Sequence, residues 1–407
     1  MTKLFFSTIC LFLFVFQLSS EEPRNKTVCL NMIVKDEEKV ITRCLASVKP
    51  LIDYWVICDT GSYDKTREII KEFLKDIPGE LHDRPWINFG HNRNEALQLA
   101  KNKADYLLII DADEVFAHED TFQFPSLNRD FYYIMTRYSG MEYARVQLVN
   151  NHLNWEWVGV LHEVLVCPEA KNSGTLLGIQ NIVHTDGARS QDPQKYLKDA
   201  KLLESALEKE PHNTRTVFYL AQSYRDAGEH AKALETYEKR VKMGGWAEEV
   251  FWAMLQVAIL QENLDYPEET ITNSYYQAFN YRPSRIEPLY RLSNYYRRHG
   301  NYMLGYLVAK LAQPIPPSKD LLFVEKWVNE FGIPLEIAIC AYWIGKYEES
   351  QQMSITLMNN PTIPDSIREC AEKNLSFANA KLVSSYIQSL PTEQPQKLAQ
   401  EFPLAAQ

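Results

Sequence analysis

Residues 107–116 read LLIIDADEVF, a run of four aliphatic residues that ends in three carboxylates, Asp111, Asp113 and Glu114. The aliphatic run predicts a strand that is buried on both faces. Two ionised carboxylates about 4 Å apart repel each other by roughly 4 kcal/mol at an effective dielectric constant near 20. A strand that ends in so much acid therefore needs something that offsets the repulsion, and a cation is the natural candidate.

Strands and helices alternate along the chain before this run. Apolar runs and apolar residues at helical spacing follow one another at the lengths of βαβ units. This alternation predicts a mainly parallel sheet that is covered on both faces and binds ligands beyond the carboxyl ends of its strands. The predicted strands span 28–34, 55–59 and 106–110, and the predicted helices span 37–48, 64–74 and 92–101.

Polar residues follow the end of each predicted strand: Lys35, Asp59 and the acidic group after Ile110. Residues i and i+2 of a strand face the same way, so Asp111 and Asp113 can both reach one ion. Such oxygen ligands favour Mg²⁺ or Mn²⁺. The alternative is a capping box, in which Asp111 opens a helix as its N-cap and Glu114 completes the cap.

Two further stretches carry residues that suit a nucleotide. Asp59 lies just before the Gly61 turn, where its carboxylate can accept a hydrogen bond from a nucleobase or a ribose; a turn followed by a helix cap is the alternative interpretation. Arg93 and Asn94 lie at the start of the predicted helix 92–101, where an arginine and free N–H groups both attract phosphate. A solvated helix residue is the alternative for Arg93.

Length and composition limit the classes of function. The 407 residues exceed what one compact core usually holds, which predicts two domains. The net charge of −10 argues against a nucleic-acid partner, because phosphate contacts need clustered Lys and Arg. The seven cysteines contain no C-x-x-C pair, and Cys29 and Cys58 lie in strand-like runs where cysteine is usually a core residue.

The N-terminus predicts a targeting segment. Leu4–Leu18 is free of charge, follows Lys3 and precedes small and acidic residues. This stretch suits the apolar region of a secretory signal peptide and is short for a membrane span, which needs about 20 residues. We therefore expect residues 1–20 to be a signal peptide or a signal anchor, and the protein to lie in the secretory pathway or at a membrane, with a cytosol-facing anchor as the alternative.

After residue 191 the strand pattern ends and a helical repeat begins. VFYLAQSYRDAGEHAKALETYEK, residues 217–239, places Tyr224 and Gly228 at the offsets of a tetratricopeptide repeat, and 292–306 and 341–350 echo it. We predict an array of helical hairpins over 191–385, with its repeat tyrosines in the core, and a loose tail over 386–407.

Five motifs in order, VCLNMIVKDEE, ICDTGSYDKT, WINFGHNRNEAL, LLIIDADEVF and WVGVLHEVL, resemble family 2 glycosyltransferases of the GT-A fold. The resemblance spans about residues 27–240 and is greatest for the subgroup that continues into tetratricopeptide repeats. It implies an α/β GT-A nucleotide-sugar-binding domain over 25–190, followed by an all-α tetratricopeptide-like domain over 191–385 that offers a surface to a protein partner. It also implies inverting transfer of a hexose from a nucleotide sugar, with UDP as the expected nucleotide, to a glycan, lipid-linked or protein acceptor.

The resemblance implies a role for each candidate residue. Glu163, in the Leu161-His162-Glu163 motif, would be the general base that deprotonates the acceptor hydroxyl. A third metal ligand is expected at His184, although His162 could take that place or orient Glu163. The remaining roles are Asp59 on the uracil or ribose, assisted by the chain near Lys35; Arg93 and Asn94 at the diphosphate; Asp111 on ribose or metal; and Asp113 on Mn²⁺ or Mg²⁺.

Two other functions compete with this interpretation. The first is a catalytically inactive relic that serves as a tetratricopeptide scaffold, but the chain retains every acidic and basic residue that the resemblance assigns to the site. The second is a sugar-phosphate nucleotidyltransferase, which would be expected to carry a Gly-rich, basic loop after its first strand. Residues 35–40, KDEEKV, are acidic instead.

Overall fold

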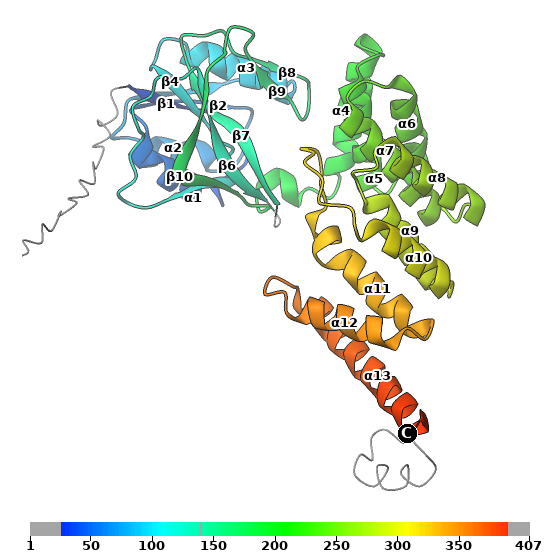
Figure 1. Ribbon diagram of the computed structural model, residues 1–407. Coiled ribbons are helices and arrows are strands. Elements are labelled where there is room, and N and C mark those ends of the chain that lie inside the picture. Colours follow the sequence, from blue (N-terminus) through cyan, green and yellow to red (C-terminus); the bar gives the residue numbers. More distant parts are fainter. Residues whose placement is uncertain (1–25, 139–140, 390–407) are drawn as a thin grey trace, which may run out of the picture. The chain divides into compact units, whose positions relative to one another are not determined.

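A computed structural model describes residues 26–138 and 141–389, and the chain divides into two compact units after Lys195 (Figure 1). The sequence predicts this division after residue 190. The predicted targeting segment 1–20 and residues 390–407 of the predicted tail lie outside the described residues. Within the described ranges, no helix combines the length and the apolar character that crossing a membrane requires.

Strands dominate the first unit, and most of them join one sheet. Their bounds are β1 (Val28–Val34), β2 (Tyr54–Asp59), β3 (Gly79–Asp83), β4 (Tyr106–Ile109), β5 (Glu114–His118), β6 (Phe131–Tyr138), β7 (Met141–Asn150), β8 (Glu156–Val158), β9 (Val164–Val166) and β10 (Ser173–Val183). The helices of this unit are α1 (Ile41–Val48), α2 (Thr66–Phe73) and α3 (Phe89–Ala100), with short 3₁₀ turns η1 (Lys49–Leu51) and η2 (Ala188–Gln191).

The main sheet has eight strands in the order β3-β2-β1-β4-β7-β6-β10-β5. The half that contains β3, β2, β1 and β4 is parallel, as predicted. The other half was not predicted: β7 runs antiparallel to both β4 and β6, and β10 pairs parallel with β6 and antiparallel with β5. Strands β8 and β9 form a separate antiparallel pair.

Strand β1 lies between two layers of side chains, which confirms that the parallel half of the sheet is covered on both faces. Val28, Leu30, Met32 and Val34 pack with α1 in one apolar cluster. Because successive strand residues face opposite ways, Cys29 faces the other layer, where residues of α3 pack. Cys29 and Cys58 are buried free thiols, as their apolar surroundings predict.

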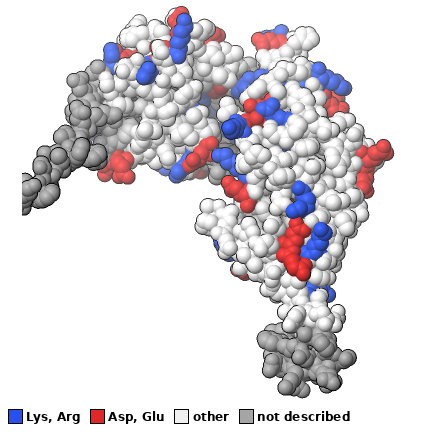
Figure 2. All heavy atoms as spheres, in the orientation of Figure 1, with Lys and Arg blue, Asp and Glu red and all other residues white. Residues whose placement is uncertain are grey.

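The second unit is helical and follows the repeat pattern. The helices are α4 (Lys195–Lys209), α5 (Thr214–Asp226), α6 (His230–Met243), α7 (Ala247–Asn263), α8 (Glu268–Tyr281), α9 (Glu287–Arg298), α10 (Tyr302–Ala312), α11 (Ile333–Trp343), α12 (Tyr347–Met358) and α13 (Asp365–Ser389), with the π-helical turn η3 (Val328–Gly332) before α11. The repeat-like stretches correspond to the pairs α5–α6, α9–α10 and α11–α12. Tyr224, Tyr237 and Tyr296 are buried, which confirms the prediction that the repeat tyrosines are core residues. On the face that Figure 2 shows, acidic and basic side chains are interspersed.

Candidate active site

The sheet brings the predicted strand ends to one edge. In the parallel register Val34 lies opposite Asp59, so the chain after β1 and the end of β2 are neighbours. Lys35 is exposed there, whereas Asp59 is buried. Strand β4 lies on the other side of β1 and leads directly to Asp111. The parallel topology that the sequence predicts therefore places Lys35, Asp59 and Asp111 along one edge of the sheet.

Arg93 joins two of the predicted acidic residues. Its Nη2 donates to Asp111 Oδ1 at 2.6 Å, and its Nε donates to Glu163 Oε1, also at 2.6 Å. The guanidinium also lies 5.1 Å from the ring centroid of Trp157, within cation–π range. The side chains of Arg93 and Glu163 are about nine-tenths buried, with exposed fractions of 10% and 9%. The general base, the phosphate-binding arginine and the carboxylate after β4 that the resemblance implies are thus in direct contact.

A second arginine extends this contact on the other side of Asp111. Arg145, on β7, lies 3.7 Å from Asp111 Oδ2 and forms a close ion pair with the buried Glu114. Arg145 was not predicted from the sequence, and the interpretation of Glu114 as part of a helix cap is wrong. Glu114 opens strand β5, because the chain turns back into the sheet after Asp111. The result is a chain of alternating charges, Glu114–Arg145–Asp111–Arg93–Glu163.

The pKa values follow from burial and from this alternation. Burial alone would raise the pKa of Asp111, but the charges of Arg93 and Arg145 outweigh it and hold the pKa below the ordinary value. Burial lowers the pKa of Arg93, and the two carboxylates reverse this and raise it above the ordinary value. Burial raises the pKa of Glu114. Asp111 and Arg93 are therefore both charged near neutral pH.

Asp113 lies in a different environment from Asp111. Strand β4 ends at Ile109, so both residues belong to a turn and the alternation of a strand does not orient them. Burial, and then the charge of Asp111, raise the pKa of Asp113. Its carboxylate lies against Gly187, where an added Cβ would be 2.8 Å from Asp113 Oδ2.

Within the described residues, no group of three or more His, Cys, Asp or Glu side chains is arranged to hold a metal ion. Asp111, Asp113 and His184 therefore do not form a preassembled metal site. The backbone N–H of His184 nevertheless donates to the carbonyl oxygen of Asp113 at 3.3 Å, so these two residues are neighbours.

Asp59 has one satisfied and one unsatisfied carboxylate oxygen. Its Oδ1 accepts hydrogen bonds from the N–H groups of Gly61 and Ser62, at 3.0 and 2.9 Å, in a turn where Gly61 has φ +109°. Its Oδ2 is buried and has no hydrogen-bond partner in the described part of the chain. A buried unpaired oxygen is costly, so this atom calls for a hydrogen-bond donor that residues 26–138 and 141–389 do not supply.

Helix α3 begins three residues before the predicted helix. Asn88 is the N-cap, and its Oδ1 accepts from the N–H of His91 at 2.8 Å. The N–H of Asn92 already donates to the Asn88 carbonyl. The prediction that free helix N–H groups surround Arg93 is therefore wrong, and only the guanidinium is left to support the prediction that this position binds phosphate.

Asn94 fastens the loop that carries Glu163. Its Nδ2 donates to the carbonyl of Trp157, and its Oδ1 accepts from the N–H of the same residue, both at 2.8 Å. Between β8 and β9 the chain turns through Gly159 at φ +109° and His162 at φ +53°. His162 is exposed and in the left-handed conformation, and its neighbour Glu163 points to Arg93. The direct contacts of Asn94 are thus with the loop, and its role in nucleotide binding stays a prediction.

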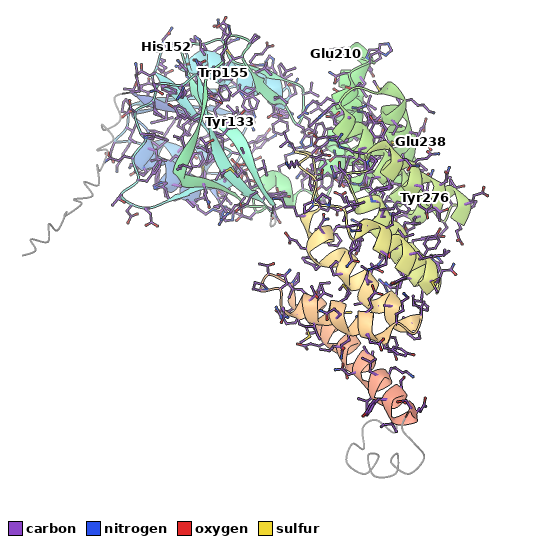
Figure 3. All side chains as sticks on the ribbon, viewed as in Figure 1. Tyr133, His152, Trp155, Glu210, Glu238 and Tyr276 are labelled. Carbon is purple, nitrogen blue, oxygen red and sulfur yellow. The ribbon has the colours of Figure 1, made fainter. Side chains whose placement is uncertain are left out.

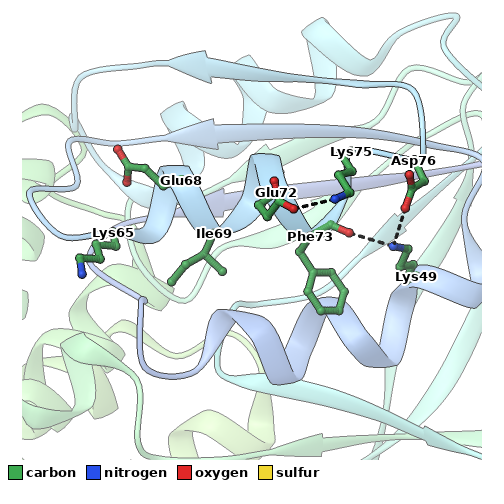
Figure 4. Close-up of a pocket in the computed structure, with 8 residues that line it drawn as sticks. All are labelled: Lys49, Lys65, Glu68, Ile69, Glu72, Phe73, Lys75 and Asp76. Atoms are coloured by element: carbon green, nitrogen blue, oxygen red, sulfur yellow. Dashed lines mark hydrogen bonds and ion pairs between the residues drawn. The ribbon is translucent and has the colours of Figure 1, made fainter.

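Trp155 is partly buried and packs against an apolar cluster of the first unit, although its ring type suits sugar stacking (Figure 3). It packs edge-on against Phe131 with centroids 5.8 Å apart, and its Nε1 donates to the carbonyl of Asn150 at 2.9 Å. A hollow on α2 is lined by Ile69, Phe73 and charged side chains, and none of its lining residues is a predicted site residue (Figure 4). In this hollow Lys49 contacts Phe73 and Asp76.

Comparisons with known proteins find similarity to glycosyltransferases and to a repeat protein. Residues 29–123 match the sequence model of the family "Glycosyl transferase family 2". SPbeta prophage-derived glycosyltransferase SunS of Bacillus subtilis is 24% identical over 241 residues, which is 54% of each chain. A TPR repeat-containing protein of Synechococcus elongatus is 41% identical over 87 residues, 21% of this chain and 20% of that protein. This chain thus spans about half the length of SunS and a fifth of the repeat protein.

Among solved structures, residues 1–349 of TarS from S. aureus, in complex with UDP-GlcNAc, align with a TM-score of 0.36 and 14% identity over 62% of this chain and 92% of that one. The matched range 29–123 contains β1, β2 and β4 together with Asp59, Arg93, Asp111 and Asp113. Residues 29–123 of the first unit therefore resemble family 2 glycosyltransferases, and a helical unit that resembles tetratricopeptide repeats follows.

Proposed function

We propose that the protein is an inverting, divalent-metal-dependent glycosyltransferase that moves a hexose from a UDP-sugar to a hydroxyl of a glycan, lipid or protein acceptor. The main support is the contact of Arg93 with both Asp111 and Glu163 at 2.6 Å. An arginine that bridges two carboxylates has the fork geometry that binds a diphosphate, and it can exchange a carboxylate for phosphate oxygens. The Arg93 side chain would then take part in both donor binding and acceptor activation.

Asp59 would bind the nucleoside part of the donor. Its buried Oδ2 accepts no hydrogen bond from the described residues. The imide N–H of uracil or a ribose hydroxyl would donate one to this oxygen. Both N–H bonds to Oδ1 hold the carboxylate in place before the ligand arrives. Lys35 is exposed beside this position and would face the nucleotide.

Asp113 fits a divalent cation better than Asp111 does. Its ionised form is disfavoured by burial and by neighbouring acid, and a cation would relieve both. Asp111 already faces two arginines. Mg²⁺ is commonly held by one or two carboxylates together with substrate phosphates. Asp113 and the donor diphosphate would therefore be the first ligands of the cation, and Asp111 or His184 would be further ligands. A bound cation would supply Lewis-acid stabilisation of the leaving diphosphate.

The proposed step is an in-line displacement. The acceptor oxygen forms a bond to the anomeric carbon as the bond from that carbon to the diphosphate oxygen breaks, and the nucleoside diphosphate leaves with the electron pair. Glu163 takes the acceptor proton once Arg93 has turned toward the diphosphate. Displacement from the opposite face inverts the anomeric configuration. Arg93 would counter the negative charge that develops on the leaving group.

Calorimetric titration with nucleoside diphosphates tests this function. We expect UDP to bind, Mn²⁺ to strengthen the binding, and Asp113→Asn to remove the strengthening without preventing metal-free binding. Asp83→Asn, which alters an exposed ion pair with Arg67, is the matched control and should behave as the wild type. If neither UDP nor any other nucleoside diphosphate binds with or without Mn²⁺, the domain is an inactive relic and the helical unit alone would act, as a surface for a protein partner.

A further inference from the structure

The segment that follows β10 contacts Asp113 twice. We call residues 184–189, HTDGAR, the strap segment. The N–H of His184 donates to the Asp113 carbonyl at 3.3 Å. Three residues later the backbone of Gly187 lies so close to the Asp113 side chain that an added Cβ would be 2.8 Å from Oδ2 and 2.9 Å from Cβ. The strap segment thus restricts the positions that the backbone and the carboxylate of Asp113 can take.

Bonds on either side of Gly187 fasten the strap segment to the start of α1. Asp186 accepts from both Nη atoms of Arg43 at 2.8 Å, in a bidentate pair between residues 143 positions apart. Ala188 donates its N–H to Glu37 Oε2 at 3.2 Å. The two residues that flank Gly187 are therefore bonded to Arg43 of α1 and to Glu37 in the turn that precedes α1.

The Arg43–Asp186 pair contributes little to the stability of the fold by itself. Its side chains are 38% and 50% exposed, and ion pairs with such exposure are screened by solvent and add little to stability. Bidentate geometry fixes direction as well as distance, so the pair is better suited to orient the strap segment. No side chain fits between Gly187 and Asp113, because every residue except glycine would push the carboxylate away.

We infer that Arg43, Asp186 and Gly187 are positioning residues that hold the Asp113 carboxylate in the direction from which it binds the cation of the donor complex. This inference rests on the proposed function. It adds that a segment more than 70 positions after Asp113 in the chain fixes the orientation of the Asp113 side chain.

The test compares matched glycine variants. Gly187→Ala should raise the Kd of Mn²⁺ for the UDP complex at least tenfold and leave the metal-free Kd of UDP within twofold. Gly174→Ala on β10 is the control, because its Cβ would also meet a neighbour at 2.8 Å, but the neighbour is the ring of Tyr132. It should lose stability without changing the affinity for Mn²⁺. Equal Mn²⁺ affinity in Gly187→Ala and the wild type would overturn the inference.

The ion pair is tested by charge reversal. Arg43→Glu should weaken Mn²⁺ binding in the UDP complex several-fold, and Arg43→Glu with Asp186→Arg should restore it. The matched control is Arg67→Glu, whose pair with Asp83 has the same 2.8 Å length and similar exposure. Failure of the double variant to restore binding contradicts the positioning role. If wild-type protein binds UDP without any response to Mn²⁺, the metal dependence of the proposed function fails first, and that outcome is visible before any variant is made.

Discussion

Arg93 donates from Nε to Glu163 Oε1 at 2.6 Å, although the two residues lie 70 positions apart in the chain. The same guanidinium donates from Nη2 to Asp111. The resemblance assigns Glu163 to the acceptor and Asp111 to the donor. Both carboxylates therefore share one positively charged side chain, that of Arg93. The consequences of this arrangement for stability, binding and pH can each be measured.

Replacing Arg93, the arginine that Asp111 and Glu163 share, should destabilise the first unit strongly. Arg93→Met leaves Asp111 and Glu163 largely buried without their main partner, and breaking a buried ion pair in this way costs about 3–5 kcal/mol. Chemical denaturation of the single variant and of Arg93→Met with Glu163→Gln checks this prediction. The double variant should recover part of the loss, because it removes one of the unpaired charges. An unfolding free energy within about 1 kcal/mol of wild type for Arg93→Met would show that the arginine is solvated instead.

Replacing the unsatisfied oxygen of Asp59 should weaken nucleotide binding without harming the fold. Asp59→Asn keeps Oδ1, which can still accept from Gly61 and Ser62, and turns the buried acceptor Oδ2 into a donor. We expect UDP to bind about 10- to 100-fold more weakly, which corresponds to the loss of one hydrogen bond to a charged group, roughly 1.5–3 kcal/mol. Calorimetry gives the affinity and thermal unfolding reports the fold. Unchanged UDP affinity would exclude Asp59 from the nucleotide site.

Asn94→Ala should release the loop that carries Glu163. The substitution removes two 2.8 Å bonds to the backbone of Trp157, and we expect a loss of about 1–3 kcal/mol in stability. It should lower kcat more than it raises KM for the donor, because the loop holds the base. Asn213→Ala, which removes the N-cap of α5 in the second unit, costs stability without touching the site and is the control. A rise in donor KM with unchanged kcat would instead place Asn94 directly on the nucleotide.

Glu37 should make the stability of the first unit depend on pH. Burial raises its pKa from 4.5 to about 7, and the charges of Asp113, Asp64 and Asp111 add to the rise, against the opposing N–H bond from Ala188. Because the folded state holds this proton more tightly than the unfolded state does, the contribution of Glu37 to stability is present below pH 4.5 and is lost as pH rises through 7.

Glu37→Gln keeps an acceptor for the Ala188 N–H and removes the titration. Urea denaturation from pH 5 to 8 should therefore show the wild type losing stability relative to Glu37→Gln as pH rises to 7, with a constant difference above it. A difference that stays constant across the whole range would contradict the raised pKa.

Strands β1, β2 and β4 of the parallel half could be predicted because each is a mainly apolar run, whereas β3, GELHD, is polar and was not predicted. Strand β1 has the predicted bounds, Val28–Val34, and all seven of its residues are buried, as a strand between two layers of helices must be. The edge that collects Asp59 and Asp111 follows from that topology alone. Helix α3 was placed too late, because its first residues, Phe89, Gly90 and His91, do not show the apolar spacing of a helix.

The antiparallel half and its contribution to the site required contacts between distant residues. Arg145 reaches Glu114 and Asp111 only because β7 pairs with both β4 and β6, and no local pattern encodes that pairing. The alternation of buried residues in β6 was a usable signal for the strand itself. The contact of Gly187 with Asp113 has no sequence signal, since a single glycine indicates a turn as readily as a close approach.

Hydrolysis of nucleotide sugars by wild type and Glu163→Gln is the most direct test of the account. A panel of UDP-hexoses with water as acceptor, assayed with Mn²⁺ and with EDTA, removes the need to know the natural acceptor. We predict metal-dependent release of UDP by the wild type, and a rate lower by about 10²–10⁴ in Glu163→Gln with UDP affinity retained, because the variant lacks the general base. Release of UDP by Glu163→Gln at the wild-type rate, or no release by the wild type from any sugar in the panel, would contradict the account.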